Sequence, residues 1–107
     1  MEPLVISLES TLPGRLALEG EIDMHTIPRL EAAFAEVLAA SGDGPISVDM
    51  ANVTFIDSSG LHLLARVASS LNGAAPLTLI NVPRRVLRVM EIVGMQDLPS
   101  IELRNEE

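Results

Sequence analysis

The chain has 107 residues, 48% of them apolar, and its fifteen acidic residues against seven basic ones give a net charge of −8. This length supports one domain with its own core and is too short for two, so residues 1–107 are expected to form a single domain. The charge has the wrong sign for binding a nucleic-acid backbone, and the absence of cysteine and lysine excludes disulfides, thiolate metal sites, a P-loop lysine and a Schiff-base lysine.

No long apolar stretch is free of polar or turn-forming residues, so no membrane segment is expected. An acidic residue follows the first methionine, where a secretory signal would carry positive charge. Together with the lack of cysteine, these features favour a cytoplasmic location. Phe34 and Phe55 are the only aromatic residues, which argues against stacking on a flat cofactor, and no cofactor is expected.

The first predicted elements are the two strands of an antiparallel hairpin. Apolar residues alternate with other residues over residues 4–8, and the alternation resumes over residues 16–22 after a turn at Pro13-Gly14. Apolar residues then recur at helical spacing and predict a helix over residues 26–41, with Thr26 as its N-cap.

The second half of the chain continues the alternation of strands and helices. Short apolar runs predict strands over residues 46–50 and 77–80, and helical spacing predicts a helix over residues 61–71 that ends at Asn72-Gly73. A third helix is predicted over residues 83–93 and is capped by Gly94. Its inward-facing residues are expected to be Val86, Leu87, Met90 and Val93.

A weak final strand is predicted over residues 101–103. A hairpin followed by alternating helices and strands predicts an α/β domain. Its mixed sheet would begin with an antiparallel pair and continue with parallel strands joined by right-handed crossovers.

The segment Asp57-Ser58-Ser59-Gly60 carries the chemistry, because it connects a strand to a helix at the carboxyl edge of the sheet, where open α/β sheets place their sites. The simplest interpretation is that Asp57 or Ser58 caps the helix. A phosphate on Ser58 is compatible with this role, since backbone N–H groups and the helix dipole stabilise an anion there. It would add about −1.5 to −2 charge units beside Asp57 and Asp23, enough to repel a docked partner.

The run over residues 53–61, Val-Thr-Phe-Ile-Asp-Ser-Ser-Gly-Leu, resembles the phosphorylation-site signature of STAS domains, specifically of the bacterial anti-sigma factor antagonists. Residues 18–23 with Thr26 resemble the family's second signature, and residues 81–87 precede a glycine-ended helix as they do in the family. The resemblance covers nearly the whole chain. It implies a single STAS-like domain whose helices pack mainly on one face of the sheet.

The resemblance also implies a regulatory function. In the family, the first serine after the aspartate, here Ser58, is phosphorylated by a partner that is both an anti-sigma factor and a serine kinase, and a PP2C-type phosphatase reverses the reaction. The unmodified chain would bind this kinase and release the sigma factor, and phosphorylation would abolish binding. The chain itself would catalyse nothing, so no catalytic residue is expected.

Neighbouring residues receive roles from the same resemblance. The neighbours of the phosphorylation site would be Asp23, Asp57, Ser59 and Gly60. The residues expected to contact the partner are Glu21, Thr26, Ile56, Leu61 and His62. His62 stands where the family commonly has a small residue; it would touch the partner or tune docking with pH, although an exposed helix histidine is more often inert.

Other interpretations remain open. Some STAS domains act as scaffolds or as subunits of larger signalling or transport complexes without cycling through phosphate. A nucleophilic triad of His25, Asp23 and Ser58 would lack a Gly-x-Ser-x-Gly elbow. A magnesium site built from Glu21, Asp23 and Asp57 would resemble a receiver domain but without its lysine, so solvated carboxylates and no metal are expected.

Overall fold

The computed structural model describes residues 4–8, 14–42, 44–71 and 75–106. Its elements in chain order are β1 (Val5–Leu8), β2 (Arg15–Ile22), α1 (Ile27–Ser41), β3 (Ser47–Ile56), α2 (Ser58–Ser70), β4 (Leu77–Ile80), α3 (Arg84–Ile92), the 3₁₀ helix η1 (Met95–Asp97) and β5 (Ile101–Arg104). The strands form one sheet in the order β1-β2-β3-β4-β5.

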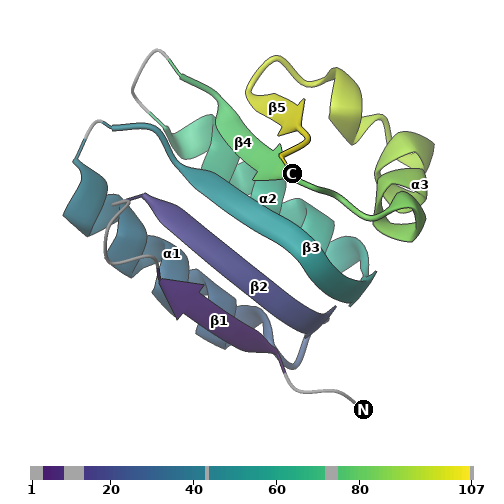
Figure 1. Cartoon of the computed structure of the whole chain (residues 1–107), viewed down its shortest axis with the longest axis horizontal. Coiled ribbons are helices and arrows are strands. Elements are labelled where there is room, and N and C mark those ends of the chain that lie inside the picture. Colours follow the sequence, from purple (N-terminus) through teal and green to yellow (C-terminus); the bar gives the residue numbers. More distant parts are fainter. Residues whose placement is uncertain (1–3, 9–13, 43, 72–74, 107) are drawn as a thin grey trace.

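The predicted α/β fold with a mixed sheet is confirmed. β1 and β2 are antiparallel, whereas the pairs β2–β3, β3–β4 and β4–β5 are parallel. Figure 1 shows α1 and α2 together behind the sheet, as expected when right-handed crossovers place successive helices on one face. α3 lies beyond the end of β4 and contacts β3.

The core lies between the sheet and the helices. Alternate residues of β2 are buried, and β4 is buried at every position. Phe34 of α1, Leu64 of α2 and Met90 of α3 are among the largest fully buried side chains. Across the ranges that the structure describes, no helix has the length and apolar character needed to cross a membrane.

The third strand is longer than the sequence predicted. A strand was expected over residues 46–50, but β3 runs for 10 residues, from Ser47 to Ile56. Ala51 and Asn52 are both exposed, which interrupts the alternation of buried and exposed residues. The pairing of β2 with β3 contains two register shifts, and such irregularities let a strand continue past an interruption. β3 therefore leads directly into Asp57.

The end of the third helix also differs from the prediction. Val86 and Met90 are buried as expected and Leu87 is partly buried, but Val93 is 58% exposed. Its backbone (φ −95°, ψ 1°) has already left the helix, which ends at Ile92, so the helical spacing no longer applies to it. Gly94 follows with φ 74°, the left-handed conformation expected of a capping glycine. The turn residues predicted at Pro13 and at Asn72-Gly73 lie outside the described residues.

Candidate functional site

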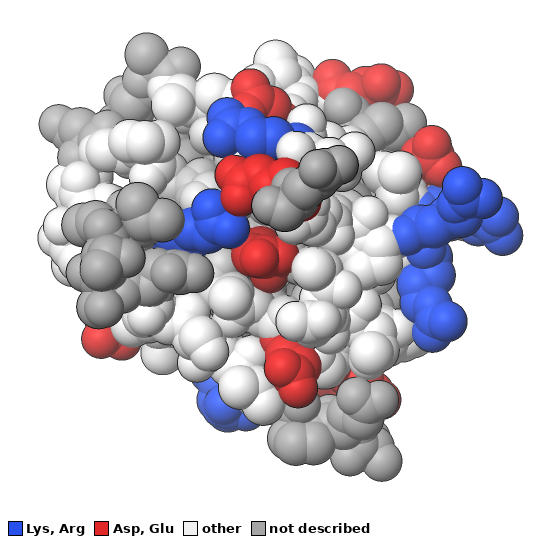
Figure 2. Space-filling model, viewed as in Figure 1, with Lys and Arg blue, Asp and Glu red and all other residues white. Residues whose placement is uncertain are grey.

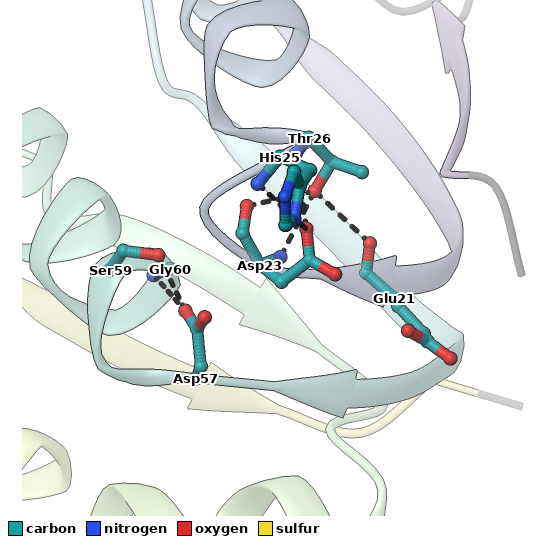
Figure 3. A network of polar contacts seen from close by, with 7 residues as sticks. All are labelled: Glu21, Asp23, His25, Thr26, Asp57, Ser59 and Gly60. Carbon is teal, nitrogen blue, oxygen red and sulfur yellow. Dashed lines mark hydrogen bonds and ion pairs between the residues drawn. The ribbon is translucent and has the colours of Figure 1, made fainter. Parts of the chain in front are cut away.

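The site lies where β2 and β3 end side by side. Ile22 and Ile56 are register partners in these parallel strands, so the loops that follow them meet at one edge of the sheet. The backbone N–H of Asp57 donates to the carbonyl oxygen of Ile22 at 3.1 Å. Figure 3 shows Asp57 and Ser59 facing the loop that carries Asp23.

Asp57 is the N-cap of α2. Its Oδ1 accepts the backbone N–H of Gly60 at 3.1 Å and the hydroxyl of Ser59 at 2.5 Å. Partial burial alone would raise the pKa of Asp57, but hydrogen bonds from the Ser59 hydroxyl and from the N–H groups of Gly60, Ser59 and Met24 outweigh it and lower the pKa. Asp57 is therefore ionised at neutral pH, and the contact with Met24 joins its carboxylate to the β2–α1 loop.

The β2–α1 loop is held by Asp23 and Thr26. The Asp23 carboxylate accepts the backbone N–H groups of His25 at 2.9 Å and Thr26 at 3.2 Å. The Thr26 hydroxyl accepts the N–H of Asp23 at 3.0 Å and donates to the carbonyl oxygen of Glu21 at 3.2 Å. Thr26 stands at the N-cap position of α1, yet its side chain makes no capping hydrogen bond to the helix. It braces the loop instead.

Asp57→Ala is expected to lower the free energy of unfolding by about 1 kcal/mol at neutral pH, because α2 loses its N-cap acceptor. Asp57→Asn retains an acceptor but cannot ionise. Since the folded-state pKa is lowered, the ionised carboxylate stabilises the fold above the ordinary aspartate pKa, and this contribution is lost as the pH falls through the folded-state value. The stability difference between wild type and Asp57→Asn should therefore shrink in acid.

Urea unfolding followed by far-UV circular dichroism measures this difference, and the method suits a chain that contains no tryptophan or tyrosine. The two proteins should be compared at neutral pH and again between about pH 4 and pH 2, the range in which an aspartate with a lowered pKa becomes protonated. A difference that stays constant over that range would contradict the assignment of the lowered pKa to Asp57.

Ser58 is the first residue of α2 and is exposed. Within the described part of the chain its hydroxyl forms no hydrogen bond, whereas the neighbouring Ser59 is half-buried and donates to Asp57. The two adjacent serines therefore differ in availability. The Ser58 side chain is exposed to solvent, while the Ser59 hydroxyl is already part of the cap.

Gly60 is buried where α2 crosses the ends of β2 and β3. A Cβ atom at this position would lie 2.7 Å from Ile22 Cγ2 and 2.7 Å from Ile56 Cγ1. Side chains do not pack at such distances, so only glycine lets α2 approach the sheet this closely. The glycine next to the serine thus has a packing role that places the serine at the surface.

The residues predicted to contact a partner occupy different environments. Glu21 and Thr26 are half-buried and His62 is exposed. Ile56 and Leu61 are only 3% and 5% exposed, because both side chains belong to the hydrophobic core. The five partner contacts stay predictions, and burial leaves little of the Ile56 and Leu61 side chains within reach of a partner.

A shallow concavity next to Ser58 was not anticipated from the sequence. This concavity, called the Ser58 hollow, has a volume of about 280 Å³ and is lined by Ser58, Leu61, His62, Ala65, Val93 and Met95. Val93 and Met95 follow α3 and reach the hollow from far along the chain. The sequence could have indicated that these two residues line the hollow only if Val93 had been predicted to be exposed. Its helical spacing predicted an inward-facing residue instead.

The carboxylates at the site do not form a metal centre. In the part of the chain that the structure describes, no group of three or more histidine, aspartate or glutamate residues is arranged to hold a metal ion. Asp23 is 8% exposed and accepts backbone N–H groups, and Asp57 caps α2. Both carboxylates are thus engaged in holding the two loops.

The fold is a mixed five-stranded sheet, and an exposed serine begins the helix that follows the third strand. These two features together are those of a STAS domain. The family model described as "Mlab, STAS domain" matches residues 9–103, and the chain accordingly belongs to the STAS domain family. Its relatives place it among the anti-sigma factor antagonists within that family. It is 35% identical over 100 residues to the anti-sigma-B factor antagonist of Staphylococcus aureus strain NCTC 8325, an alignment that covers 90% of this chain and 92% of that protein.

A second relative and one solved structure agree with this placement. The anti-sigma-B factor antagonist of Staphylococcus epidermidis is 34% identical over 83 residues, covering 77% of this chain and 76% of its own. A crystal structure of an anti-sigma factor antagonist from Mycobacterium paratuberculosis superposes with a TM-score of 0.80 at 25% identity, covering 94% of this chain and 86% of that one. The anti-sigma factor antagonist SpoIIAA in its unphosphorylated form shares the fold, with a TM-score of 0.58 at 21% identity over 82% and 83% of the two chains.

Proposed function

We propose that this chain is an anti-sigma factor antagonist whose binding is switched off by phosphorylation of Ser58. The unmodified protein binds an anti-sigma factor that also has serine kinase activity, and this binding releases the sigma factor. Transfer of phosphate to Ser58 ends the interaction, and a PP2C-type phosphatase restores the binding form. The chain acts by binding in the cytoplasm and is itself the substrate of the kinase rather than an enzyme.

The observation that carries this proposal is the exposed Ser58 hydroxyl at the start of α2, which forms no hydrogen bond with any residue that the structure describes and lies beside a serine whose hydroxyl donates to Asp57. The N-terminus of a helix stabilises an added phosphate through its N–H groups and its dipole. Asp57 already accepts the N–H of Gly60, and this bond does not involve the Ser58 side chain. A phosphate on Ser58 therefore leaves the cap intact and does not need to unfold the helix.

Electrostatic repulsion explains how the phosphate blocks binding. Phosphorylation adds about −1.5 to −2 charge units at neutral pH. Ser58 lies next to Asp57, whose lowered pKa keeps it ionised, and the whole chain has a net charge of −8. An anti-sigma factor that docks at this edge of the sheet meets the Asp57 carboxylate in the unmodified protein, and meets that carboxylate together with the phosphate in the phosphorylated protein.

Intact-mass and peptide mass spectrometry on the chain recovered from its native cells tests the proposal. The expected result is a phosphate on Ser58 whose occupancy changes between growth and stress. Incubation of the purified chain with ATP and the anti-sigma factor of the same organism should add one phosphate to the wild type and to Ser59→Ala, and none to Ser58→Ala. Binding to a larger assembly with no phosphate under any condition would instead support a scaffold role.

A further inference from the structure

The polar character of the Ser58 hollow comes from two side chains, Ser58 and His62. The four other lining residues are leucine, alanine, valine and methionine. Ser58 and His62 are four residues apart in α2, a spacing that places side chains one turn apart on the same face, with Cβ atoms about 5–6 Å from each other. The hollow and the helical spacing thus agree that the imidazole and the hydroxyl are neighbours.

The His62 imidazole is available for a new contact. His62 is exposed, and its ring forms no hydrogen bond or ion pair with any residue in the described ranges 4–8, 14–42, 44–71 and 75–106. The other histidine, His25, is placed differently, because its Nδ1 lies 3.9 Å from the Asp23 carboxylate. Among the described residues, the His62 imidazole therefore has no charged partner, and it lies beside the proposed acceptor serine.

The ionisable side chains near His62 are engaged elsewhere or lie outside the Ser58 hollow. Asp57, the N-cap of α2, is held by the cap hydrogen bonds, and Arg66 of α2 forms an ion pair with Glu31 at 3.0 Å. On the segment that packs opposite, the hollow is lined by Val93 and Met95, which do not ionise. Glu91 and Asp97 belong to α3 and η1 and are exposed outside the lining, and Asp23 is turned into its own loop.

We propose that His62 binds the phosphoryl group of phosphorylated Ser58, with its protonated ring donating a hydrogen bond to a phosphate oxygen across one turn of α2. This inference deepens the proposed function, on which it rests for the presence of the phosphate. The phosphate is then held over the Ser58 hollow rather than extended into solvent. Phosphorylation thus covers an apolar concavity that the unmodified protein presents, in addition to changing the charge of the surface.

The contact makes the switch sensitive to pH. A phosphoserine has a second pKa of about 6 and a histidine side chain an ordinary pKa of about 6.5, so the charge of such a pair depends on pH near neutrality. A neighbouring phosphate favours the imidazolium and raises the pKa of His62, and the imidazolium favours the dianion and lowers the second pKa of the phosphate. The ion pair is strongest where the imidazole is protonated and the phosphate is a dianion, and it is lost as the imidazole gives up its proton at higher pH.

A chain with phosphoserine incorporated at position 58 during translation tests the contact without any kinase. NMR titration of the imidazole C–H signals should give a His62 pKa about half a unit to one unit higher than in the unmodified chain, a 3- to 10-fold gain in proton affinity. His25, the only other histidine, should shift much less. The ³¹P titration should show a phosphate pKa lowered by a similar amount, and His62→Gln should abolish this change while His25→Gln retains it.

An unchanged His62 pKa in the phosphorylated chain, or the same phosphate titration in wild type and His62→Gln, would overturn the inference. These outcomes are separate from a failure of the proposed function. If cells never phosphorylate Ser58, the proposed function fails, whereas the titration of the synthetic phosphoprotein still gives its own result. If Ser58 is phosphorylated in cells but His62 does not respond, only the His62 contact is wrong.

Discussion

Ser58→Glu is expected to weaken binding to the anti-sigma factor by about 10- to 100-fold relative to the unmodified wild type, because a permanent negative charge is placed at the proposed interface. Ser58→Ala should bind as tightly as the unmodified wild type. In the presence of ATP the wild type should dissociate with time as it is phosphorylated, whereas Ser58→Ala should stay bound. Surface plasmon resonance with the immobilised anti-sigma factor measures both effects.

Ser69→Glu is the matched control for charge. Ser69 is an exposed serine of the same helix, near its other end, and the substitution adds the same charge far from the site. It should leave the affinity within about 2-fold, since a distant exposed charge is largely screened by salt. Equal affinities of wild type, Ser58→Ala and Ser58→Glu would refute the interfacial model, and equal losses in Ser58→Glu and Ser69→Glu would reduce it to a general charge effect.

Gly60→Val is expected to destabilise the fold by about 3 kcal/mol or more, because its side chain overpacks a closely packed site. Alanine is favoured over glycine in a helix by about 1 kcal/mol, so propensity alone predicts that Gly60→Ala would be stabilising. The added Cβ would lie 2.7 Å from side-chain atoms of both Ile22 and Ile56, and overpacking of this kind costs about 1–3 kcal/mol. In Gly60→Ala the cost of the clash should cancel or exceed the gain in helix propensity. Valine adds two further methyl groups, so Gly60→Val should be destabilised more.

Urea unfolding at neutral pH, followed by far-UV circular dichroism, measures the Gly60 series. Ser69→Val serves as the control, because it introduces the same side chain at an exposed position of α2 and should change the free energy of unfolding by no more than about 0.5 kcal/mol. A Gly60→Ala protein that is more stable than wild type by the full helix-propensity difference would show that α2 does not approach the sheet as closely as described.

Most of the fold could be predicted from the sequence, because the patterns that indicate its strands and helices are local. The alternation in β2 and the helical spacing in α1 each depend on residues within a few positions of one another. The predictions were wrong where a local pattern was interrupted or continued past its element. β3 extends through the exposed Ala51 and Asn52 because its neighbour β2 supplies the pairing, and Val93 falls just beyond the end of α3.

The candidate site could also be predicted in part from the sequence. The run from Asp57 to Gly60 directed attention to Ser58, and the structure places Ser58 at the exposed start of α2. The sequence did not distinguish packing residues from surface residues around it. Ile56 and Leu61, two of the predicted partner contacts, are buried, because whether an apolar residue beside a site is exposed depends on the helix or strand that covers it.

The sequence by itself determined the order of strands and helices, the position of Ser58 at the carboxyl edge of the sheet and the family to which the chain belongs, because each depends on short-range patterns. Only the tertiary structure decided which of the two serines donates its hydroxyl to Asp57, why Gly60 must lack a side chain, and that Val93 and Met95 complete a hollow with Ser58 and His62. These features arise from contacts between segments distant in the chain, which no local pattern records.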